Sequence, residues 1–261
     1  MSVLVIGSAG LIGHAVRTHL EARGAAVVAP DRDELSFDGF EQTTCDVTDL
    51  AALERIMSSQ PVSAIVHCGA ASGPVVERDD PRRVIEINVG GTANRLEIGR
   101  RHRIPRFGYC SSIAAYGTTP PAPVPETAPL RPLDGYGATK AAGEHLVAAY
   151  AAAVRARRRR GRRSRRAGRR RRDRPCNITG GAVHTIQDVI DSVRRTDQRC
   201  RAKPAPPDPD GAARWPARLE LTAARTRSRM EAEQGLRRRR SRVPPVAGAP
   251  RRMTVRSVDQ R

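Results

Sequence analysis

The chain has 261 residues and a formal net charge of +20, which is unevenly spread: residues 1–154 carry a net charge of −3 and residues 155–261 carry +23. The first half can bury a core, whereas the second is rich in like charge and holds a single aromatic residue, so it lacks the material for one. No apolar run approaches the roughly 18 residues of a membrane helix and the chain opens on a strand instead of a signal peptide, so we expect a cytoplasmic protein without membrane contact.

The first predicted element is a strand at residues 3–6, whose unbroken apolar run is typical of a strand buried on both faces. Three glycines follow, and residues 14–23 predict a helix. Gly7 permits the turn, Gly10 lets the backbone approach a pyrophosphate, and Gly13 lets the helix lie close to the strand. A purely structural turn is the alternative, but the strand–loop–helix context favours dinucleotide binding at the helix N-terminus. The predicted cofactor contacts of this loop are Gly7, Gly10, Leu11, Ile12 and Gly13.

A second buried strand is predicted at residues 25–29, and Asp31 stands just past its end. An acidic side chain there accepts hydrogen bonds from the hydroxyls of an adenosine ribose and repels a 2′-phosphate, so NAD is favoured over NADP. Arg32 weakens that preference because a neighbouring cation tolerates the phosphate. The alternative is an aspartate in a solvated turn.

A third strand is predicted at residues 43–45 and ends at Asp46. An amphipathic helix at residues 50–59 follows, with Thr48 or Asp49 as its N-cap. Asp46 is placed to face an adenine amino group, or it is simply a polar strand end.

The fourth predicted strand, at residues 64–68, is followed by the small residues Gly69, Ala70 and Ala71. Small side chains there allow the close approach of a flat cofactor. Strands that alternate with helices at this spacing predict right-handed crossovers and an α/β fold with a doubly wound parallel sheet.

A long helical pattern covers residues 81–102, with Asn88 and the pair Gly90-Gly91 in its middle. These residues cost stability inside a helix, so they need a packing or bonding reason. A fifth strand at residues 106–110 ends at a pair of serines, and a proline-rich loop follows it.

Tyr136 and Lys140 lie four residues apart at the start of an alanine-rich helix, so they share one helical face. A free tyrosine has a pKa near ~10, and we expect the lysine ammonium to lower it. A serine at the preceding strand end can hydrogen-bond a substrate hydroxyl while the tyrosine removes its proton. A surface pair is the alternative for an isolated Tyr-x-x-x-Lys, but the glycine loop and the serines favour a catalytic role.

Together these motifs resemble the extended short-chain dehydrogenase/reductase family, and within it the NAD-dependent epimerase/dehydratase branch that acts mainly on nucleotide sugars. The resemblance covers residues 1 to about 154. It implies a Rossmann-like fold, NAD as cofactor and Ser112, Tyr136 and Lys140 as catalytic residues. The position of a frequent second hydroxyl residue in that family is Ala114 here. The cofactor-binding residues that the resemblance implies beyond the glycine loop are Asp31, Arg32, Asp46, Val47, Gly69, Ala70, Ala71, Asn88, Tyr136 and Lys140.

The five cysteines show no C-x-x-C pairing and no metal-ligand spacing. Cys45, Cys68 and Cys110 fall in or beside predicted strands. We therefore interpret them as small buried apolar residues in a reducing compartment, and we expect neither a disulfide nor a metal site.

The second half of the chain divides into three segments by composition. Residues 155–175 form an arginine-rich segment, with 14 arginines between residues 155 and 174, that we expect to be disordered. Residues 176–200 resemble a fragment of the family's substrate domain, and residues 201–261 are a mostly disordered basic tail. We interpret two arginine-rich segments, residues 155–174 and about 227–261, as out-of-frame or otherwise aberrant translation of GC-rich coding sequence, with part of the substrate domain lost.

A real arginine-rich arm that grips nucleic acid is the alternative for those segments. The aromatic residues that would stack on bases are absent from them, so we do not expect nucleic acid as a partner. Composition alone does not separate accidental from selected basicity.

The resemblance implies an NAD-dependent epimerase or dehydratase of nucleotide sugars that works through transient hydride transfer. Two alternatives stay open: an NAD-dependent sugar or hydroxy-acid dehydrogenase, and an inactive NAD-binding remnant or basic nucleic-acid binder. The family often dimerises through its long helices, which correspond here to residues 81–102 and 136–154.

Overall fold

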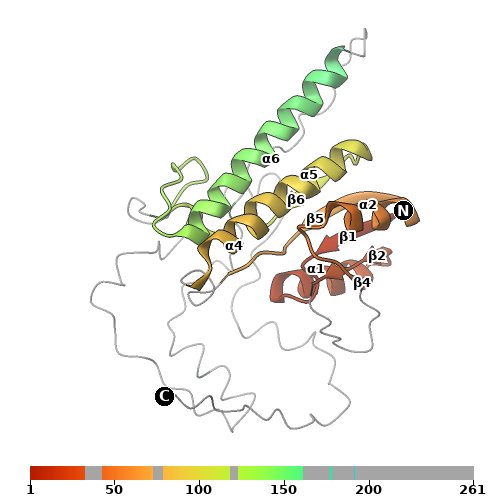
Figure 1. Cartoon of the computed structure of the whole chain (residues 1–261), viewed down its shortest axis with the longest axis horizontal. Coiled ribbons are helices and arrows are strands. Elements are labelled where there is room, and N and C mark those ends of the chain that lie inside the picture. Colours follow the sequence, from red (N-terminus) through yellow and green to blue (C-terminus); the bar gives the residue numbers. More distant parts are fainter. Residues whose placement is uncertain (33–42, 73–78, 118–122, 161–176, 178–190, 192–261) are drawn as a thin grey trace. The chain divides into compact units, whose positions relative to one another are not determined.

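The computed structural model describes residues 1–32, 43–72, 79–117 and 123–160, together with Asn177 and Asp191, and for residues 155–160 it describes the backbone alone (Figure 1). The rest of the predicted segments 155–175, 176–200 and 201–261 lies outside these residues. The structure corrects one boundary of the predicted segment 155–175. Helix α6 runs from Gly135 to Arg160, so the first residues of the segment expected to be disordered are helical.

The main sheet has four parallel strands: β1 (Ser2–Ile6), β2 (Val27–Val28), β5 (Val62–His67) and β6 (Phe107–Tyr109). Their spatial order is β2-β1-β5-β6. The chain steps from β1 to one side and later returns to add β5 on the other side. Such a reversal of strand order opens a crevice at the carboxyl ends of β1 and β5, where doubly wound sheets bind ligands. The predicted fold class is confirmed for this part of the chain.

A second, two-stranded parallel sheet joins β3 (Pro30–Asp31) to β4 (Thr43–Thr44). The third predicted strand therefore pairs beside the main sheet and not within it. Asp31 also lies inside β3, instead of just past a strand. The short β3 stays close to β1 through a hydrogen bond from the Gly7 amide to the Pro30 carbonyl, at 3.2 Å.

Helices cover the sheet (Figure 1): α1 (Leu11–Glu21) packs on β1 and β2, and α5 (Gly91–Arg101) packs on β5 between α2 (Leu50–Ser59) and α6. The predicted N-cap of α2 is Asp49, whose carboxylate accepts the Ala52 amide at 2.9 Å. None of the described helices is long and apolar enough to cross a bilayer. The buried core between strands and helices comprises Leu4, Ile6, Val28, Cys45, Leu53, Ile56, Met57, Ile65 and Ile98.

The predicted helix at residues 81–102 is broken into three parts: α4 (Pro81–Ile85), the π-helical turn η1 (Glu86–Gly90) and α5. The π-helical turn contains Asn88 and Gly90, and Gly91 is the first residue of α5. A side chain at Gly91 would put its Cβ 3.0 Å from the Arg95 Nη1 atom and 3.1 Å from the Val47 Cγ2 atom. Packing thus explains this mid-helix glycine, and π-turns of this kind are frequent at functional sites.

Candidate active site

The glycine loop between β1 and α1 meets the loop after β5 at the crevice of the sheet. Gly7 has a φ of +80°, and a Cβ there would lie 2.3 Å from the Gly69 amide nitrogen. A Cβ at Gly13 would lie 1.9 Å from the Gly7 carbonyl oxygen. The chain itself therefore requires glycine at both positions, as expected for a tight turn and a close helix–strand approach.

Gly10 differs from its two neighbours because the chain does not require it. Its φ is −73°, and a Cβ there would contact only the Gly7 carbonyl oxygen, at an ordinary 3.4 Å. Helix α1 begins at this point without a side-chain cap hydrogen bond and without an acidic residue in its first turn. Leu11 is 90% exposed and Ile12 55% exposed. Such an open helix start fits a phosphate group.

Asp31 reaches from β3 to the glycine loop. One carboxylate oxygen accepts the Ala9 amide at 2.8 Å, and the other accepts the Arg32 amide at 2.7 Å. Two backbone donors therefore hold the carboxylate at the edge of the loop. The predicted contact of this carboxylate with the hydroxyls of an adenosine ribose stays a prediction. Arg32 is engaged at this point through its backbone.

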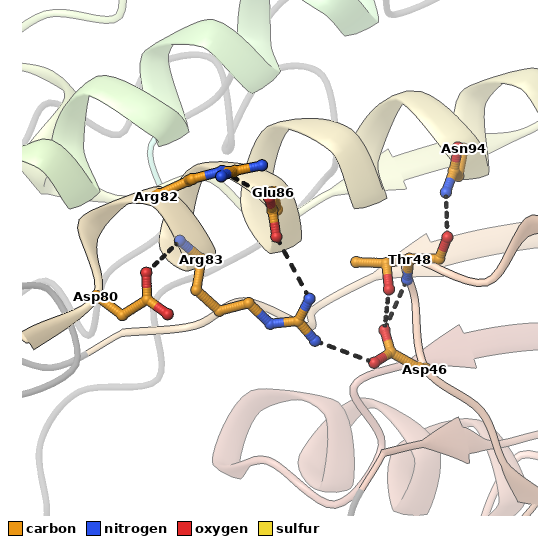
Figure 2. A network of polar contacts seen from close by, with 7 residues as sticks. All are labelled: Asp46, Thr48, Asp80, Arg82, Arg83, Glu86 and Asn94. Carbon is orange, nitrogen blue, oxygen red and sulfur yellow. Dashed lines mark hydrogen bonds and ion pairs between the residues drawn. The ribbon is translucent and has the colours of Figure 1, made fainter.

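Asp46 anchors a polar network after β4 (Figure 2). Its carboxylate accepts the Thr48 amide at 2.8 Å and the Thr48 hydroxyl at 2.7 Å, and it pairs with the Arg83 guanidinium of α4 at 3.2 Å. Burial opposes ionisation, but the Thr48 hydrogen bonds and the Arg83 charge hold the pKa of Asp46 below its usual value. The predicted contact of Asp46 with an adenine stays a prediction.

The same network fixes the loop that carries Val47. Arg83 also pairs with Glu86 at 3.5 Å, and the Asn94 amide donates to the Thr48 carbonyl at 3.1 Å (Figure 2). Arg83 thus ties the start of the long helical stretch to the strand-end loop. Sequence reasoning missed Arg83 because an arginine in a helical first turn is typical of a solvated surface.

The Asn88 side chain holds the loop after β5 through hydrogen bonds. Its side-chain oxygen accepts the Ala71 amide at 2.8 Å, and its side-chain nitrogen donates to the Ala71 carbonyl at 2.9 Å and to the Thr139 hydroxyl at 3.0 Å. Asn88 is 2% exposed, and both of its N–H donors are used inside the chain. The expectation that it contacts the cofactor stays a prediction; in the structure Asn88 ties Ala71, after β5, to η1 and α6.

The two serines after β6 point in different directions. The Ser112 hydroxyl accepts the Ala114 amide at 3.2 Å, which caps the short 3-10 helix η2 (Ile113–Ala115), and it hydrogen-bonds to Tyr136. Ser111 instead donates to the Glu144 carboxylate of α6 at 2.5 Å. The geometry separates two residues that the sequence left side by side, and Ser112 is the one next to the tyrosine.

Tyr136 and Lys140 lie on the face of α6 that meets the end of β6. The Lys140 ammonium donates to the Cys110 carbonyl at 2.9 Å and lies 5.7 Å from the centre of the Tyr136 ring. Burial lowers the pKa of Lys140 to about 8. Burial raises the pKa of Tyr136, although the hydrogen bond with Ser112 acts in the opposite direction. The expected lowering by the lysine is therefore wrong for this arrangement, in which burial outweighs the neighbouring groups.

Two residues that sequence reasoning missed lie beneath these groups. Arg95 is 1% exposed, and its Nη1 atom donates to the His67 ring at 2.7 Å. Its Nε and Nη2 atoms have no hydrogen-bond partner among the described residues. Burial lowers its pKa to about 9, and burial together with Arg95 and Lys140 holds the pKa of His67 well below its usual value. A mid-helix arginine carries no signal of such burial.

Glu144 and Asn177 were also missed. Glu144 lies four residues after Lys140, and this spacing was a signal that it shares the face of Tyr136 and Lys140. Asn177 is 6% exposed; its side chain accepts from the Tyr116 hydroxyl at 2.9 Å and donates to the Val124 carbonyl at 3.1 Å. It thereby anchors a residue of the predicted fragment 176–200 to the segment after η2, a long-range contact with no local signal.

The sequence of this chain is similar to those of a known enzyme family. A model of the NAD dependent epimerase/dehydratase family matches residues 3–195. A UDP-glucose 4-epimerase of Streptomyces lividans is 31% identical over 156 residues, which are 58% of this chain and 47% of that protein. The chain thus spans about half the length of the curated relatives it matches.

Solved structures agree with that comparison. The UDP-glucose 4-epimerase of Thermus thermophilus in complex with NAD is 31% identical with a TM-score of 0.55, and the match covers 59% of this chain and 52% of that one. The L-threonine dehydrogenase of Clostridium difficile is 28% identical with a TM-score of 0.54, and the match covers 58% and 49%. The described sheet and helices are therefore shared with enzymes of more than one activity.

Proposed function

Because the chain belongs to the NAD dependent epimerase/dehydratase family, we propose that it binds NAD and acts on a nucleotide sugar through transient hydride transfer. The observation that carries the proposal is the grouping of Ser112, Tyr136 and Lys140 at the end of β6, where the Ser112 hydroxyl acts to lower the pKa of Tyr136 and the Lys140 ammonium lies 5.7 Å from the centre of the Tyr136 ring. This group lies at the same carboxyl edge of the sheet as the glycine loop. One cofactor can therefore span both.

The described residues fit NAD at the end where its phosphates and adenosine would bind. Gly10 leaves the start of α1 open for a pyrophosphate, and Asp31 supplies ribose acceptors in a position that a 2′-phosphate would find repulsive. The residues Gly69 to Ala71, held by Asn88, carry no large side chain that would keep a flat cofactor away. When bound, NAD supplies a nicotinamide ring that accepts a hydride and returns it.

The chain's own residues would move the proton. We propose that Ser112 hydrogen-bonds a substrate hydroxyl and that Tyr136 removes its proton, because the Ser112 hydroxyl is near enough to Tyr136 to act on its pKa. Because burial raises the pKa of Tyr136, its ionised form needs a nearby positive charge. The Lys140 ammonium, held by the Cys110 carbonyl, is the cation on the same helical face.

The class of substrate follows from the relatives and not from a pocket. The relatives with matching sequence include UDP-glucose 4-epimerases and a dTDP-glucose 4,6-dehydratase of Neisseria meningitidis, 30% identical over 174 residues. A nucleoside diphosphate sugar is therefore the leading substrate. The choice between epimerisation and dehydration lies with residues that hold the sugar.

A second candidate function is a net NAD-dependent dehydrogenase. The structural likeness to an L-threonine dehydrogenase favours this alternative because that enzyme shares the same sheet and helices. The two candidates differ in the cofactor's fate: an epimerase or dehydratase restores NAD in each turnover, whereas a dehydrogenase releases NADH.

The test begins with the full chain and its thermal unfolding in the presence of NAD or NADP. We expect the unfolding temperature to rise with NAD more than with NADP, since a ligand that binds the native state stabilises it. Gly10→Ala should abolish that rise while keeping a cooperative transition, and Tyr136→Phe should keep the rise. Equal unfolding temperatures with and without NAD would contradict the proposal.

Turnover is then measured with UDP- and dTDP-sugars by separating the products, with NADH absorbance as a parallel signal. A product without NADH accumulation supports an epimerase or dehydratase, and stoichiometric NADH supports the dehydrogenase. Tyr136→Phe should slow either reaction by roughly 10²- to 10⁴-fold. An unchanged rate in this variant would contradict the role of the tyrosine.

We also propose a cytoplasmic homodimer. Helix α4, η1 and α6 together line an apolar hollow formed by Pro81, Val84, Ile85, Val89, Gly135, Ala138 and Thr139. Ile85 is 55% exposed, so a partner helix would bury apolar surface there. Light scattering of the full chain tests this: Ile85→Asp should convert a dimer into a monomer, and a wild-type monomer would contradict the proposal.

A further inference from the structure

Two cysteines meet at the carboxyl edge of the sheet. Cys68 directly follows β5 and Cys110 directly follows β6, and the parallel register that pairs His67 with Tyr109 brings these next residues together. Their sulfur atoms are 3.4 Å apart. Both side chains are partly exposed and both thiols are free. The sequence predicts them as small buried apolar residues, because they fall in or beside predicted strands, and gives no sign that the two sulfur atoms meet.

The pair lies between the two ends of the candidate site. Cys68 is followed by Gly69, whose backbone contacts Gly7 of the glycine loop. The Cys110 carbonyl accepts the Lys140 ammonium at 2.9 Å, and Ser111 and Ser112 follow it directly. A change in the position of Cys110 therefore moves the acceptor that holds Lys140.

The surroundings make the two thiols unequal. The hydrogen bond with Cys68, helped by the Lys140 ammonium, lowers the pKa of Cys110 to about 7 despite its burial. The same hydrogen bond, together with burial, raises the pKa of Cys68. A thiolate is the attacking species in thiol–disulfide exchange, and the Lys140 ammonium, which donates to the Cys110 carbonyl at 2.9 Å, is placed to stabilise the Cys110 thiolate, so we expect Cys110 to react first and Cys68 to resolve.

We propose that Cys68 and Cys110 are a redox-active pair that closes to a disulfide on exposure to a low-molecular-weight disulfide such as oxidised glutathione. The Cys110 thiolate attacks one glutathione sulfur, the glutathione disulfide breaks, and the departing glutathione thiolate takes up a proton. Cys68 then loses its proton and attacks the Cys110 sulfur, which releases the second glutathione as a thiol. The protein loses two thiol hydrogens, and one small disulfide becomes two thiols.

Closure needs a movement at the strand ends. The sulfur separation must shorten from 3.4 Å to about 2.0 Å, the length of a disulfide bond. Since Cys110 lies in the backbone that holds Lys140, this movement weakens the hydrogen bond between the lysine and the Cys110 carbonyl. Resting on the proposed function, the consequence is that oxidation lowers the turnover that depends on Tyr136 and Lys140, and reduction restores it.

The test uses the full chain with Cys176→Ser and Cys200→Ser, so that three thiols remain, and oxidised glutathione as the probe. Intact mass and peptide mapping should find a Cys68–Cys110 linkage without retained glutathione, reversed by dithiothreitol. Cys68→Ser should stop at one glutathione bound to Cys110. Cys110→Ser should react at least tenfold more slowly at neutral pH. Cys45→Ala, a change at a buried cysteine outside the pair, should leave the linkage intact.

Stable glutathione on Cys110 in the chain with both cysteines, or a linkage that includes Cys45, would overturn the proposal. The mapping does not depend on catalysis, so it judges the pair even if the proposed enzyme activity fails. Where the reduced chain is active, a tenfold or greater loss on closure supports the effect on Lys140. Unchanged turnover in a fully linked sample would overturn that effect and leave the linkage standing.

Discussion

The two ends of the candidate site are built in opposite ways. The glycine-loop end, Gly7 to Gly13 with Asp31, uses backbone N–H groups and the absence of side chains. The tyrosine–lysine end consists of Ser112, Tyr136 and Lys140, and it contains two buried cationic side chains. Lys140 is 3% exposed, and the neighbouring Arg95 is 1% exposed. The first end is therefore shaped by steric fit at little electrostatic cost, and the second keeps buried charge that opposes folding.

The largest effect is expected from a side chain in the glycine loop. Gly7→Ala should destabilise the fold by about 3–5 kcal/mol, because its Cβ would collide with the Gly69 backbone at a φ of +80°. Chemical unfolding measures the change. Gly24→Ala is the matched control, since Gly24 has a φ of +74° but no atom of the described residues lies within 4 Å of the added Cβ. Equal losses in the two variants would show that the collision does not matter.

Removal of the amide behind the β5 loop should have the next largest effect. Asn88→Ala deletes three hydrogen bonds and leaves the half-buried Ala71 backbone groups without these partners, for a loss of about 2–4 kcal/mol. Asn94→Ala, which removes a part-buried amide from the same helical stretch, should cost about 1 kcal/mol. If the denaturant midpoints of the two variants fall equally, the hydrogen bonds of Asn88 do not hold the loop after β5 more strongly than an ordinary part-buried amide would.

At the tyrosine–lysine end we expect a substitution to raise the free energy of unfolding instead of lowering it. Lys140→Met should abolish turnover yet stabilise the fold at pH 7 by about 1–3 kcal/mol, because a buried ammonium with a lowered pKa opposes folding. Thermal and urea unfolding of the full chain measure the gain.

The pH dependence follows from the pKa of Lys140, which is about 8 in the folded chain against an ordinary value of 10.5. Between these values the unfolded chain binds more protons, so wild-type stability rises with pH. The advantage of Lys140→Met should be complete below pH 8 and shrink towards pH 10.5. Arg55→Met, at a side chain 72% exposed, should show no such trend. A pH-independent advantage would mean that the ammonium is not the cause.

The smallest effect is expected in the network of Figure 2. Arg83→Gln should cost less than about 1 kcal/mol at low salt, and less still at high salt, because its ion pairs are partly exposed. It should also raise the pKa of Asp46, measurable by NMR titration. The stability from that lowered pKa is present above the ordinary value and lost as pH falls, so acid should cost the variant less. A large, salt-independent loss would contradict this reading.

Local patterns determined much of this protein. The order of strands and helices, the three glycines after β1, the N-cap Asp49 and the four-residue spacing of Tyr136 and Lys140 could all be predicted from the sequence. Each depends on residues close together in the chain, where backbone geometry and periodicity act directly. Over most of the chain beyond Arg160 the sequence has no such strand or helix pattern, so only its amino-acid composition could be interpreted.

Only the tertiary structure decided which serine meets Tyr136, that Asn88 clamps a loop, that Arg95 is buried, and that Cys68 and Cys110 touch. It also reversed the expected direction of the Tyr136 pKa. These features depend on contacts between residues distant in sequence and on the exclusion of water from charged groups. Residue type and spacing predict neither these contacts nor the exclusion of water, since both arise only when the strands and helices pack together.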